Sequence, residues 1–452
     1  EAIVVDPARV VEPYLEEARA QGLRIRGVTE THIHADFVSG ARELAERTGA
    51  ALFLSGEGGD EWSYRYVHDY EHRLLRDGDI FKIGNIRFRV LHTPGHTPEH
   101  ICLLLTDTAG ANRPMGIFTG DFVFVGSVGR PDLLEIAAGI EGTAESLARD
   151  MFHSLRRFRE LPDHLQLWPG HGAGSACGKG LGAVPSSTVG YEKYFNWALQ
   201  HDDEDAFVWE LLAGQPEPPR YFAVMKRVNR EGPAVLQGLP ALERLPFERL
   251  PALLDRKCTV IDTRPAAAFA ASHIPGTVNI PYEGSFLTWM GWLAPYDEPF
   301  YLIANSSRAT EIMQDLLAIG LEHVGGYFDP GVLEEWTFSG RAFQSYRAVT
   351  VEQLAEAIRA EEVTVLDVRA RSEWDEGHIP GARHLMLGYL PDHLDEIPAD
   401  RAIVVQCRSG ARSAIGASLL QARGFDNVMN LAGGLRAWQH ASLPVEGVKR
   451  ET

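Results

Sequence analysis

Two stretches of the chain repeat one another. VIDTRPAAAFAASHIPGTVNIP begins at Val260, and VLDVRARSEWDEGHIPGARHLM begins at Val365. The matched positions pair Asp262 with Asp367, Arg264 with Arg369, His273 with His378, and Pro275 with Pro380. Each copy continues with a second apolar strand (FYLIA, AIVVQ), a helix and a third short strand (HVGGY, NVMNLAGG). This internal repeat predicts two homologous α/β units of about 100 residues each.

The residues before the repeat predict a further domain. A length of 452 residues favours about three domains. Residues 1–220 alternate short β-like runs such as NIRFRVL with helical stretches such as GARELAERTG, which is typical of a layered α/β domain. The Pro and Gly cluster after it predicts a linker over 221–240 that includes a short helix. The predicted domains are therefore 1–220, 241–345 and 346–452, and since the chain opens inside an apolar run, N-terminal strands could be missing.

Composition limits the partners. The formal charge of −19 argues against nucleic acid, because phosphate binding depends on clustered Lys and Arg. The sequence contains no apolar run of the roughly 18 residues that a membrane span needs, so we expect a soluble protein without a membrane partner. The four cysteines are scattered, which favours a reducing compartment, and we expect the cytoplasm.

Histidines and carboxylates follow several predicted strands. His32, His34 and Asp36 lie in THIHADF after an apolar run, and residues two apart in an extended segment point to one face. Further candidates are His96 in TPGHT, Asp121 in FTGD and His171 in WPGHG. A rigid scaffold can bring such strand-end side chains together around a metal. His68, His72, His92 and His100 are expected to face solvent or to cap loops.

These four motifs, in this order, resemble the metallo-β-lactamase superfamily over about 220 residues. The resemblance implies an N-terminal αββα sandwich. Two-metal members of the superfamily carry His after the motif's Asp, where this chain has Phe37. Loss of that imidazole favours one metal per chain and makes a dinuclear zinc hydrolase of the glyoxalase II type less favoured.

Within the superfamily, the chain resembles the persulfide dioxygenases, which use iron. That resemblance implies one Fe(II) per chain held by His32, His96 and Asp121, with zinc as the alternative metal. It also implies that His34, Asp36 and His171 orient these ligands. Arg130 in GRPD matches an arginine of that group and would bind a substrate carboxylate; the alternative is a salt bridge to Asp132 that fixes the loop.

Cys407 lies in QCRSGARS, between an apolar strand and a helix. Loop amides and the helix N-terminus stabilise a thiolate there, so we predict a nucleophile. The spacing resembles that of the rhodanese sulfurtransferases, which implies α/β domains with parallel sheets and a persulfide carried on Cys407. The residues expected to bind the transferred group are Arg408, Ser409, Gly410 and Arg412.

The first repeat copy lacks this cysteine. Aligning Arg308 with Arg412 places Ile303 opposite Cys407, so residues 241–345 are predicted to be catalytically silent. The apolar segment Phe286–Pro295 could cover a neighbouring domain, form a contact in a homo-oligomer, or pack in the core. Cys102 and Cys177 are expected to be structural, with the edge of the metal site as the alternative place for Cys177.

These expectations combine into one function and two rivals. A low-molecular-weight thiol persulfide is oxidised by O2 to sulfite, and Cys407 passes a second sulfur to sulfite, giving thiosulfate. Flow from thiosulfate to the persulfide fits the sequence equally well. The rivals are a zinc-dependent thioester hydrolase and a non-catalytic sulfur-relay protein that docks a client. Glutathione, bacillithiol and coenzyme A all remain open as carrier thiols.

Overall fold

The computed structural model describes residues 1–133, 135, 142–175, 177–215, 217–398 and 400–447. The chain forms two compact units, residues 1–240 with 317–320, and residues 241–316 with 321–452. Among the described residues, no helix combines the length and the apolar character needed to cross a membrane.

Two β-sheets form the centre of the first unit. One is a parallel sheet in the order β1 (Ala2–Val5), β2 (Ile25–Thr29), β3 (Ala51–Ser55) and β4 (His72–Leu75). The other is mixed, in the order β12 (Ser187–Thr188), β11 (Gln166–Pro169), β8 (Gly116–Gly120), β7 (Ile101–Asp107), β6 (Ile86–His92) and β5 (Ile80–Ile83). A short ribbon pairs β9 (Val123–Phe124) with β10 (Ser127–Val128).

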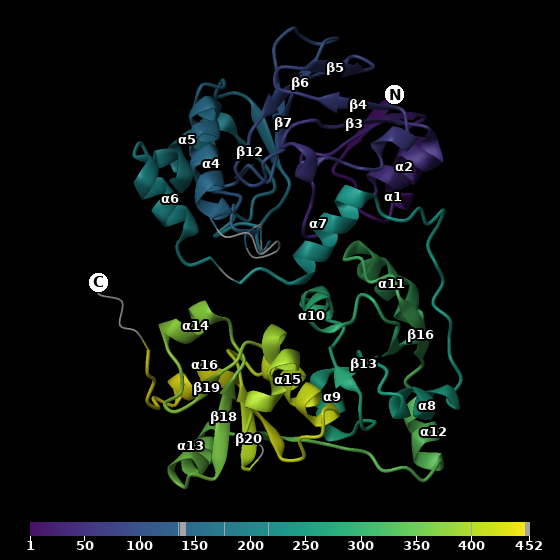
Figure 1. Cartoon of the computed structure of the whole chain (residues 1–452), viewed down its shortest axis with the longest axis vertical. Helices are drawn as coiled ribbons and strands as arrows, with labels where there is room; N and C mark the ends of the chain where they lie inside the picture. The colour runs from purple at the N-terminus through teal and green to yellow at the C-terminus, as the bar shows by residue number, and fades with distance from the viewer. Residues whose placement is uncertain (134, 136–141, 176, 216, 399, 448–452) are drawn as a thin grey trace. The chain divides into compact units, whose positions relative to one another are not determined.

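Helices cover the outer face of each sheet (Figure 1). On the first sheet lie α1 (Glu12–Ala20) and α2 (Ala41–Thr48), and on the second α4 (Thr143–Arg159), α5 (Val189–Phe195) and α6 (Glu204–Leu212). Three apolar clusters fill the spaces between layers, represented by Leu44 with Leu52, Phe81 with Phe88, and Met151 with Leu167. The predicted αββα sandwich is therefore confirmed.

The segment 221–240, predicted to be a linker with a short helix, contains that helix. Its first half is helix α7 (Tyr221–Glu231), and the whole segment belongs to the first unit. Asn229 is buried and donates from Nδ2 to the carbonyls of His34 (2.8 Å) and Phe37 (2.7 Å). The Pro and Gly cluster dominated the sequence pattern, whereas the apolar face of the helix, with Phe222 and Met225 buried, determines where it packs.

Each repeat copy in the second unit contains a parallel sheet, as predicted. The first has the order β14 (Val278–Asn279), β13 (Val260–Asp262), β15 (Phe300–Ile303) and β16 (Val324–Phe328). Its helices are α8 (Arg249–Asp255), α9 (Ala266–Ala271), α10 (Phe286–Leu293), α11 (Ala309–Ala318) and α12 (Val332–Phe338).

The second sheet has the order β17 (Arg347–Val349), β21 (Val428–Leu431), β20 (Ala402–Gln406), β18 (Val363–Asp367) and β19 (Arg383–His384). Its helices are α13 (Val351–Arg359), α14 (Arg371–Glu376), α15 (Ala411–Ala422) and α16 (Gly434–His440). Short 3-10 turns occur in both units, at Asp60–Trp62, Val67–Asp69, Trp197–Gln200, Ser306–Arg308, Leu387–Asp392 and Leu394–Glu396.

The residues shared by the two copies stabilise the fold. Arg264 donates to the buried Asp262 (Nη2 to Oδ2, 2.6 Å), and Arg369 donates to Asp367 in the same way at the same distance. The repeated histidine stacks on an aromatic ring in each copy, His273 on Phe269 and His378 on Trp374. The repeat that defines the architecture therefore contains structural residues rather than reactive ones.

The two copies pack closely against each other around α15. The backbone N–H of Asn279, in the first copy, donates to Ser418 Oγ of α15 (2.9 Å). Trp292 of α10 packs over Gly388 and against the ring of Tyr389. The apolar segment Phe286–Pro295 thus covers the neighbouring copy, which was one of its predicted roles.

Candidate functional site

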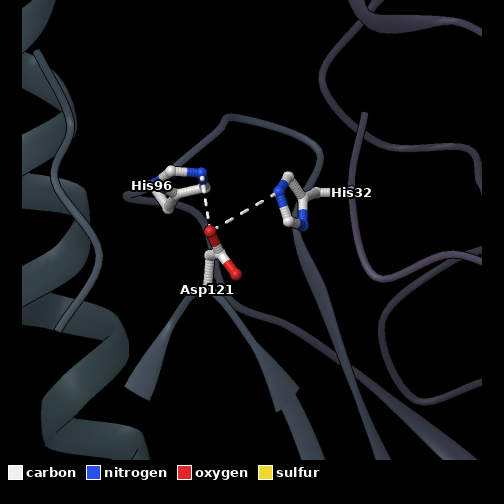
Figure 2. Close-up of side chains that lie close together, drawn as sticks. All are labelled: His32, His96 and Asp121. Carbon is white, nitrogen blue, oxygen red and sulfur yellow. Dashed lines mark ion pairs between the residues drawn. The ribbon is translucent and has the colours of Figure 1, made fainter. Parts of the chain in front are cut away.

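Loops at the ends of strands bring His32, His96 and Asp121 together. His32 follows β2, His96 lies between β6 and β7, and Asp121 comes directly after β8. The Oδ2 atom of Asp121 lies 4.0 Å from His32 Nε2 and 3.6 Å from His96 Nε2. Figure 2 shows the three side chains pointing toward one another. Each is at most 2% exposed, so this is a buried cluster of nitrogen and oxygen donors.

Hydrogen bonds fix both imidazoles through Nδ1. His96 Nδ1 lies 3.0 Å from the Arg130 carbonyl, to which it donates, leaving the Nε2 lone pair directed at Asp121. His32 Nδ1 lies 3.0 Å from Thr31 Oγ1, and Thr31 in turn bonds to the carboxylate of Asp6. The rings are thus oriented by the surrounding protein.

The donor set fits a divalent metal. His32 Nε2 and Asp121 Oδ2 are buried and have no hydrogen-bond partner among the described residues, an arrangement that is costly unless a cation binds there. Burial lowers the pKa of both His32 and His96, which keeps the imidazoles neutral and able to coordinate. The predicted metal site is therefore supported in its coarse form, with zinc and iron both compatible.

The second carboxylate oxygen of Asp121 contacts His171. His171 Nδ1 lies 2.8 Å from Asp121 Oδ1, and its Nε2 lies 2.7 Å from Asp36 Oδ2. Burial opposes protonation of this ring, but the charge and hydrogen bonds of Asp121 and Asp36 raise the pKa of His171 to about 11. His171 and Asp36 therefore occupy the places in which they would orient Asp121.

His34 lies beside the cluster and pairs with Asp6. Its Nε2 is 3.2 Å from Asp6 Oδ1, and its ring lies 4.3 Å from that of Phe37. Burial lowers the pKa of His34, whereas Asp6 raises it, with a net value of about 9. His34 therefore contacts the cluster through its ring, which lies 4.2 Å from that of His32.

The expectation that His100 faces solvent or caps a loop is wrong. His100 is fully buried, its Nε2 accepts from the Asp121 backbone N–H at 3.2 Å, and its ring stacks on that of His32 at 5.2 Å. Its place directly before the apolar run ICLLLT is the sequence signal that could have identified it as a buried group.

Cys177 lies at the edge of the metal cluster, which was the alternative place predicted for it. Its side chain is buried, and its sulfur lies within 4.8 Å of donor atoms of both Asp36 and His171. It comes from the Gly-rich loop between β11 and β12. Its place a few residues after His171 is the sequence signal for this position. Cys102, in contrast, is in the core as expected.

Arg130 is buried beside the metal cluster and paired with Asp132. Its Nε donates to Asp132 Oδ1 (2.8 Å) and its Nη2 to Asp132 Oδ2 (2.5 Å). Because its carbonyl also accepts from His96, the residue fixes the loop in the way the alternative interpretation predicts. Its role in holding a substrate carboxylate stays a prediction.

Cys407 lies between β20 and α15 as predicted. Its side chain is 1% exposed. The Gly410 N–H donates to Cys407 Sγ at 3.2 Å, and Ser413 Oγ donates to it at 3.4 Å. Gly410 has a φ of 101°, the left-handed conformation that turns its N–H toward the sulfur. The loop therefore presents donors and a helix N-terminus to one sulfur atom.

The other residues predicted to bind the transferred group lie outside this set of hydrogen-bond donors. Arg408 and Ser409 are exposed. Arg412 is partly buried, and its guanidinium forms two bonds with Glu373, at 2.5 and 2.8 Å. The Arg412 guanidinium, expected to bind the transferred group, is thus paired with the Glu373 carboxylate.

The predicted equivalence of Ile303 with Cys407 is wrong by one residue. Strand β13 pairs Asp262 with Ile303, whereas β18 pairs Asp367 with Gln406. Ile303 therefore matches Gln406, and Ala304 occupies the cysteine position. The loop between this strand and the next helix has five residues in the first copy (304–308) and four in the second (407–410). An alignment that matches Arg308 with Arg412, beyond the longer loop, is therefore shifted by one residue at the strand end.

Comparison with known proteins places both parts of the chain. The model of the metallo-beta-lactamase superfamily matches residues 1–171, and that of the rhodanese-like domain matches 247–335 and 350–441. A solved metallo-beta-lactamase from Staphylococcus aureus subsp. aureus COL is 41% identical with a TM-score of 0.66, over 73% of this chain and 92% of that one. The chain thus belongs to the metallo-β-lactamase superfamily.

Two curated relatives match separate parts. A hydroxyacylglutathione hydrolase of Gloeobacter violaceus is 38% identical over 171 residues, which are 38% of this chain and 58% of that relative. A sulfurtransferase of Allochromatium vinosum is 41% identical over 85 residues, which are 19% of this chain and 79% of that protein. This member of the superfamily is therefore a fusion of a metallo-β-lactamase domain with two rhodanese-like domains, as the motifs predicted.

Proposed function

We propose that the protein oxidises a low-molecular-weight thiol persulfide to sulfite with iron and O2, and that Cys407 transfers sulfane sulfur. The observation that carries the proposal is the donor set of His32, His96 and Asp121 in the same chain as the Cys407 loop. Two imidazoles and one carboxylate are the ligands typical of non-haem Fe(II) oxygenases.

The protein's own groups have defined roles in this proposal. His32 Nε2, His96 Nε2 and Asp121 Oδ2 would hold a ferrous ion, which would supply a template for combining O2 with the sulfane sulfur, while that sulfur supplies the four electrons that reduce O2. His171 would hold Asp121 through its other oxygen, and the Arg130 carbonyl would keep the His96 ring in place. The net reaction is RSSH + O2 + H2O giving RSH, sulfite and two protons.

Sulfur transfer would follow at Cys407. Its sulfur attacks the outer sulfur of a second RSSH, the S–S bond breaks, and RSH leaves with the proton. Sulfite then removes the outer sulfur from the resulting cysteine persulfide, giving thiosulfate and the free thiol. The Gly410 N–H and the α15 terminus would stabilise negative charge on Cys407 in each step.

The test is reconstitution of the full chain with Fe(II) under anaerobic conditions, followed by glutathione persulfide in aerated buffer. We expect O2 uptake with matching sulfite. Cys407→Ser should abolish thiosulfate and leave O2 uptake nearly intact, while His96→Ala should abolish uptake. The partly buried Cys258 offers a matched control, Cys258→Ser, with both activities retained. An iron-loaded chain that consumes no O2 refutes the proposal.

A zinc-dependent thioester hydrolase is the second candidate. It is favoured by the hydroxyacylglutathione hydrolase of Gloeobacter violaceus, which matches residues of the metal domain at 38% identity. Zinc-loaded protein should then hydrolyse a hydroxyacyl-glutathione thioester with the turnover of an ordinary enzyme. Hydrolysis by the zinc form, together with an inactive iron form, would favour this candidate over the first.

A further inference from the structure

Helix α7 contacts the loop that joins β2 to α2. This loop covers residues 30–40 and contains the metal-site residues His32 and Asp36. The contact is made by Asn229, whose side chain is 1% exposed. Asn229 lies well beyond residues 1–171, which the superfamily model matches, and the proposed oxidation assigns no role to it.

Every polar atom of the Asn229 side chain binds the backbone of this loop. Nδ2 donates to the carbonyls of His34 (2.8 Å) and Phe37 (2.7 Å), and Oδ1 accepts from the Ser39 N–H (2.8 Å). A side-chain amide has two N–H donors and one carbonyl oxygen, so both donors and the oxygen are used. The three bonds lie on both sides of Asp36 and fix the backbone before and after it.

The Asp36 carboxylate depends on this backbone for its position. Its Oδ1 is buried and has no hydrogen-bond partner among the described residues, while its Oδ2 lies 2.7 Å from His171 Nε2. The nearby Val38 N–H donates to the Ala318 carbonyl (2.7 Å), in the segment 317–320 that belongs to the same compact unit. The loop around Asp36 is therefore held through its backbone, by residues distant in sequence.

Asp36 is connected to a proposed metal ligand through one imidazole ring. His171 Nδ1 lies 2.8 Å from Asp121 Oδ1, and the other carboxylate oxygen of Asp121 faces His32 and His96. A shift of Asp36 would therefore pass through His171 to the carboxylate that binds the metal. Partners that orient a metal ligand commonly change metal affinity by about 10- to 100-fold when they are altered.

We propose that Asn229 is a positioning residue of the metal site. It holds the loop so that Asp36 and His171 keep Asp121 directed at the metal. Phe37 has an apolar side chain, so its backbone carbonyl is the group through which a hydrogen bond can hold the loop at that point. The inference goes beyond the proposed persulfide oxidation, because it applies equally to an iron and to a zinc centre.

The test is the Zn²⁺ affinity of the metal-free full chain, measured by competition with a coloured chelator. The binding event that His96→Ala removes identifies the site. Asn229→Asp keeps the size of the side chain and the Oδ1 acceptor, but it replaces the Nδ2 donor with an oxygen that faces two carbonyls. We expect an affinity at least about tenfold below that of the parent. The added negative charge alone would strengthen cation binding, so charge cannot cause this loss.

Asn279→Asp is the matched control. Asn279 is buried in the second unit, and its Nδ2 also donates to two backbone carbonyls, those of Asp262 (2.8 Å) and Arg264 (2.9 Å). We expect both variants to lower the midpoint of thermal unfolding, whereas Asn279→Asp should bind Zn²⁺ with the parental affinity. A purely structural Asn229 would lower only the midpoint, as the control does.

Hydrogen exchange of the unaltered chain keeps the test decisive if a variant misfolds. Coupling between two sites is reciprocal, so Zn²⁺ should slow amide exchange in residues 34–40 and in α7 more than in α6, a helix of the same unit that packs on the second sheet. The proposal is overturned by parental Zn²⁺ affinity in Asn229→Asp, by an equal loss in Asn279→Asp, or by no selective slowing in these segments. Because no turnover is measured, these outcomes are independent of whether the iron form consumes O2.

Discussion

Gly410→Ala tests whether the loop geometry makes Cys407 reactive. Gly410 has a φ of 101° and its N–H donates to Cys407 Sγ at 3.2 Å. A Cβ at this position meets only Gly433 N and Leu431 O, both at 3.4 Å, so alanine fits but is strained. Left-handed backbone costs a non-glycine residue about 1–3 kcal/mol, and relaxation of that strain turns the N–H away from the sulfur.

The expected magnitude follows from the lost hydrogen bond. A bond to a charged group contributes about 1.5–3 kcal/mol, so the rate of sulfur transfer from a persulfide to sulfite should fall about 10- to 100-fold, at roughly 1.4 kcal/mol for each factor of ten. Gly424→Ala is the matched control, because Gly424 follows the same helix, has a φ of 93° and has open space for a Cβ.

Both variants should lose similar stability, measured as the midpoint of thermal inactivation. Only Gly410→Ala should lose rate, measured as thiosulfate formed per second by intact protein. If the two variants transfer sulfur equally fast, the Gly410 N–H does not activate Cys407, and the reasoning is refuted.

Three further predictions concern the second unit. Gly388→Ala places a Cβ 2.3 Å from Trp292 Cε3 and should destabilise the unit by about 1–3 kcal/mol. In a Trp292→Ala background, urea inactivation should show little further destabilisation from Gly388→Ala. Additive effects of the two substitutions would contradict the contact between Trp292 and Gly388. Ala304→Cys should gain no sulfur on exposure to persulfide, because its loop is one residue longer than that of the active copy; mass spectrometry that finds sulfur on the introduced thiol would show that the thiol alone suffices. Burial raises the pKa of Glu373, but the ion pair with Arg412 lowers it by more, so that the net pKa lies below the ordinary value of 4.5. The pair therefore stabilises the fold above pH 4.5, and this stabilisation is lost as the pH falls below that value. Glu373→Gln should therefore lower the inactivation midpoint at pH 7, and its difference from the parent protein should shrink as the pH falls below 4.5; a constant difference would contradict the sign.

The sequence predicted the architecture well because the repeat and the metal motifs depend on local patterns. Strands such as β6 and β20 and helices such as α2 and α15 coincide with runs whose apolar spacing was clear. A short helix was predicted where α7 lies, but the prolines and glycines around it gave no sign that it belongs to the first unit. Its packing depends on Asn229 reaching the carbonyls of His34 and Phe37, and contacts that distant in sequence leave no local pattern.

The site was predicted residue by residue where motifs exist and missed where they do not. His32, His96 and Asp121 converge, and Cys407 lies at its helix, because each sits at a strand end within a recognisable motif. His100 reaches the same centre although it belongs to none of these motifs, and Cys177 was expected there only as an alternative. The metal's identity also lies outside the sequence pattern, because the same imidazole and carboxylate donors bind zinc and iron.

The first copy, predicted to be silent, has the scaffold contacts of the second copy but not its cysteine. Asp262, Arg264 and His273 make the same contacts as their partners in the second copy, whereas Ala304 replaces the nucleophile and its loop has changed length. At the same time, β14 and α9 of the silent copy cover α15, the helix whose N-terminus faces Cys407. Helix α15 is buried from Ser413 to Gln421, and a helix with little polar surface needs a neighbour on each side. The first copy therefore completes the hydrophobic environment of α15, a structural role that requires its scaffold but no cysteine.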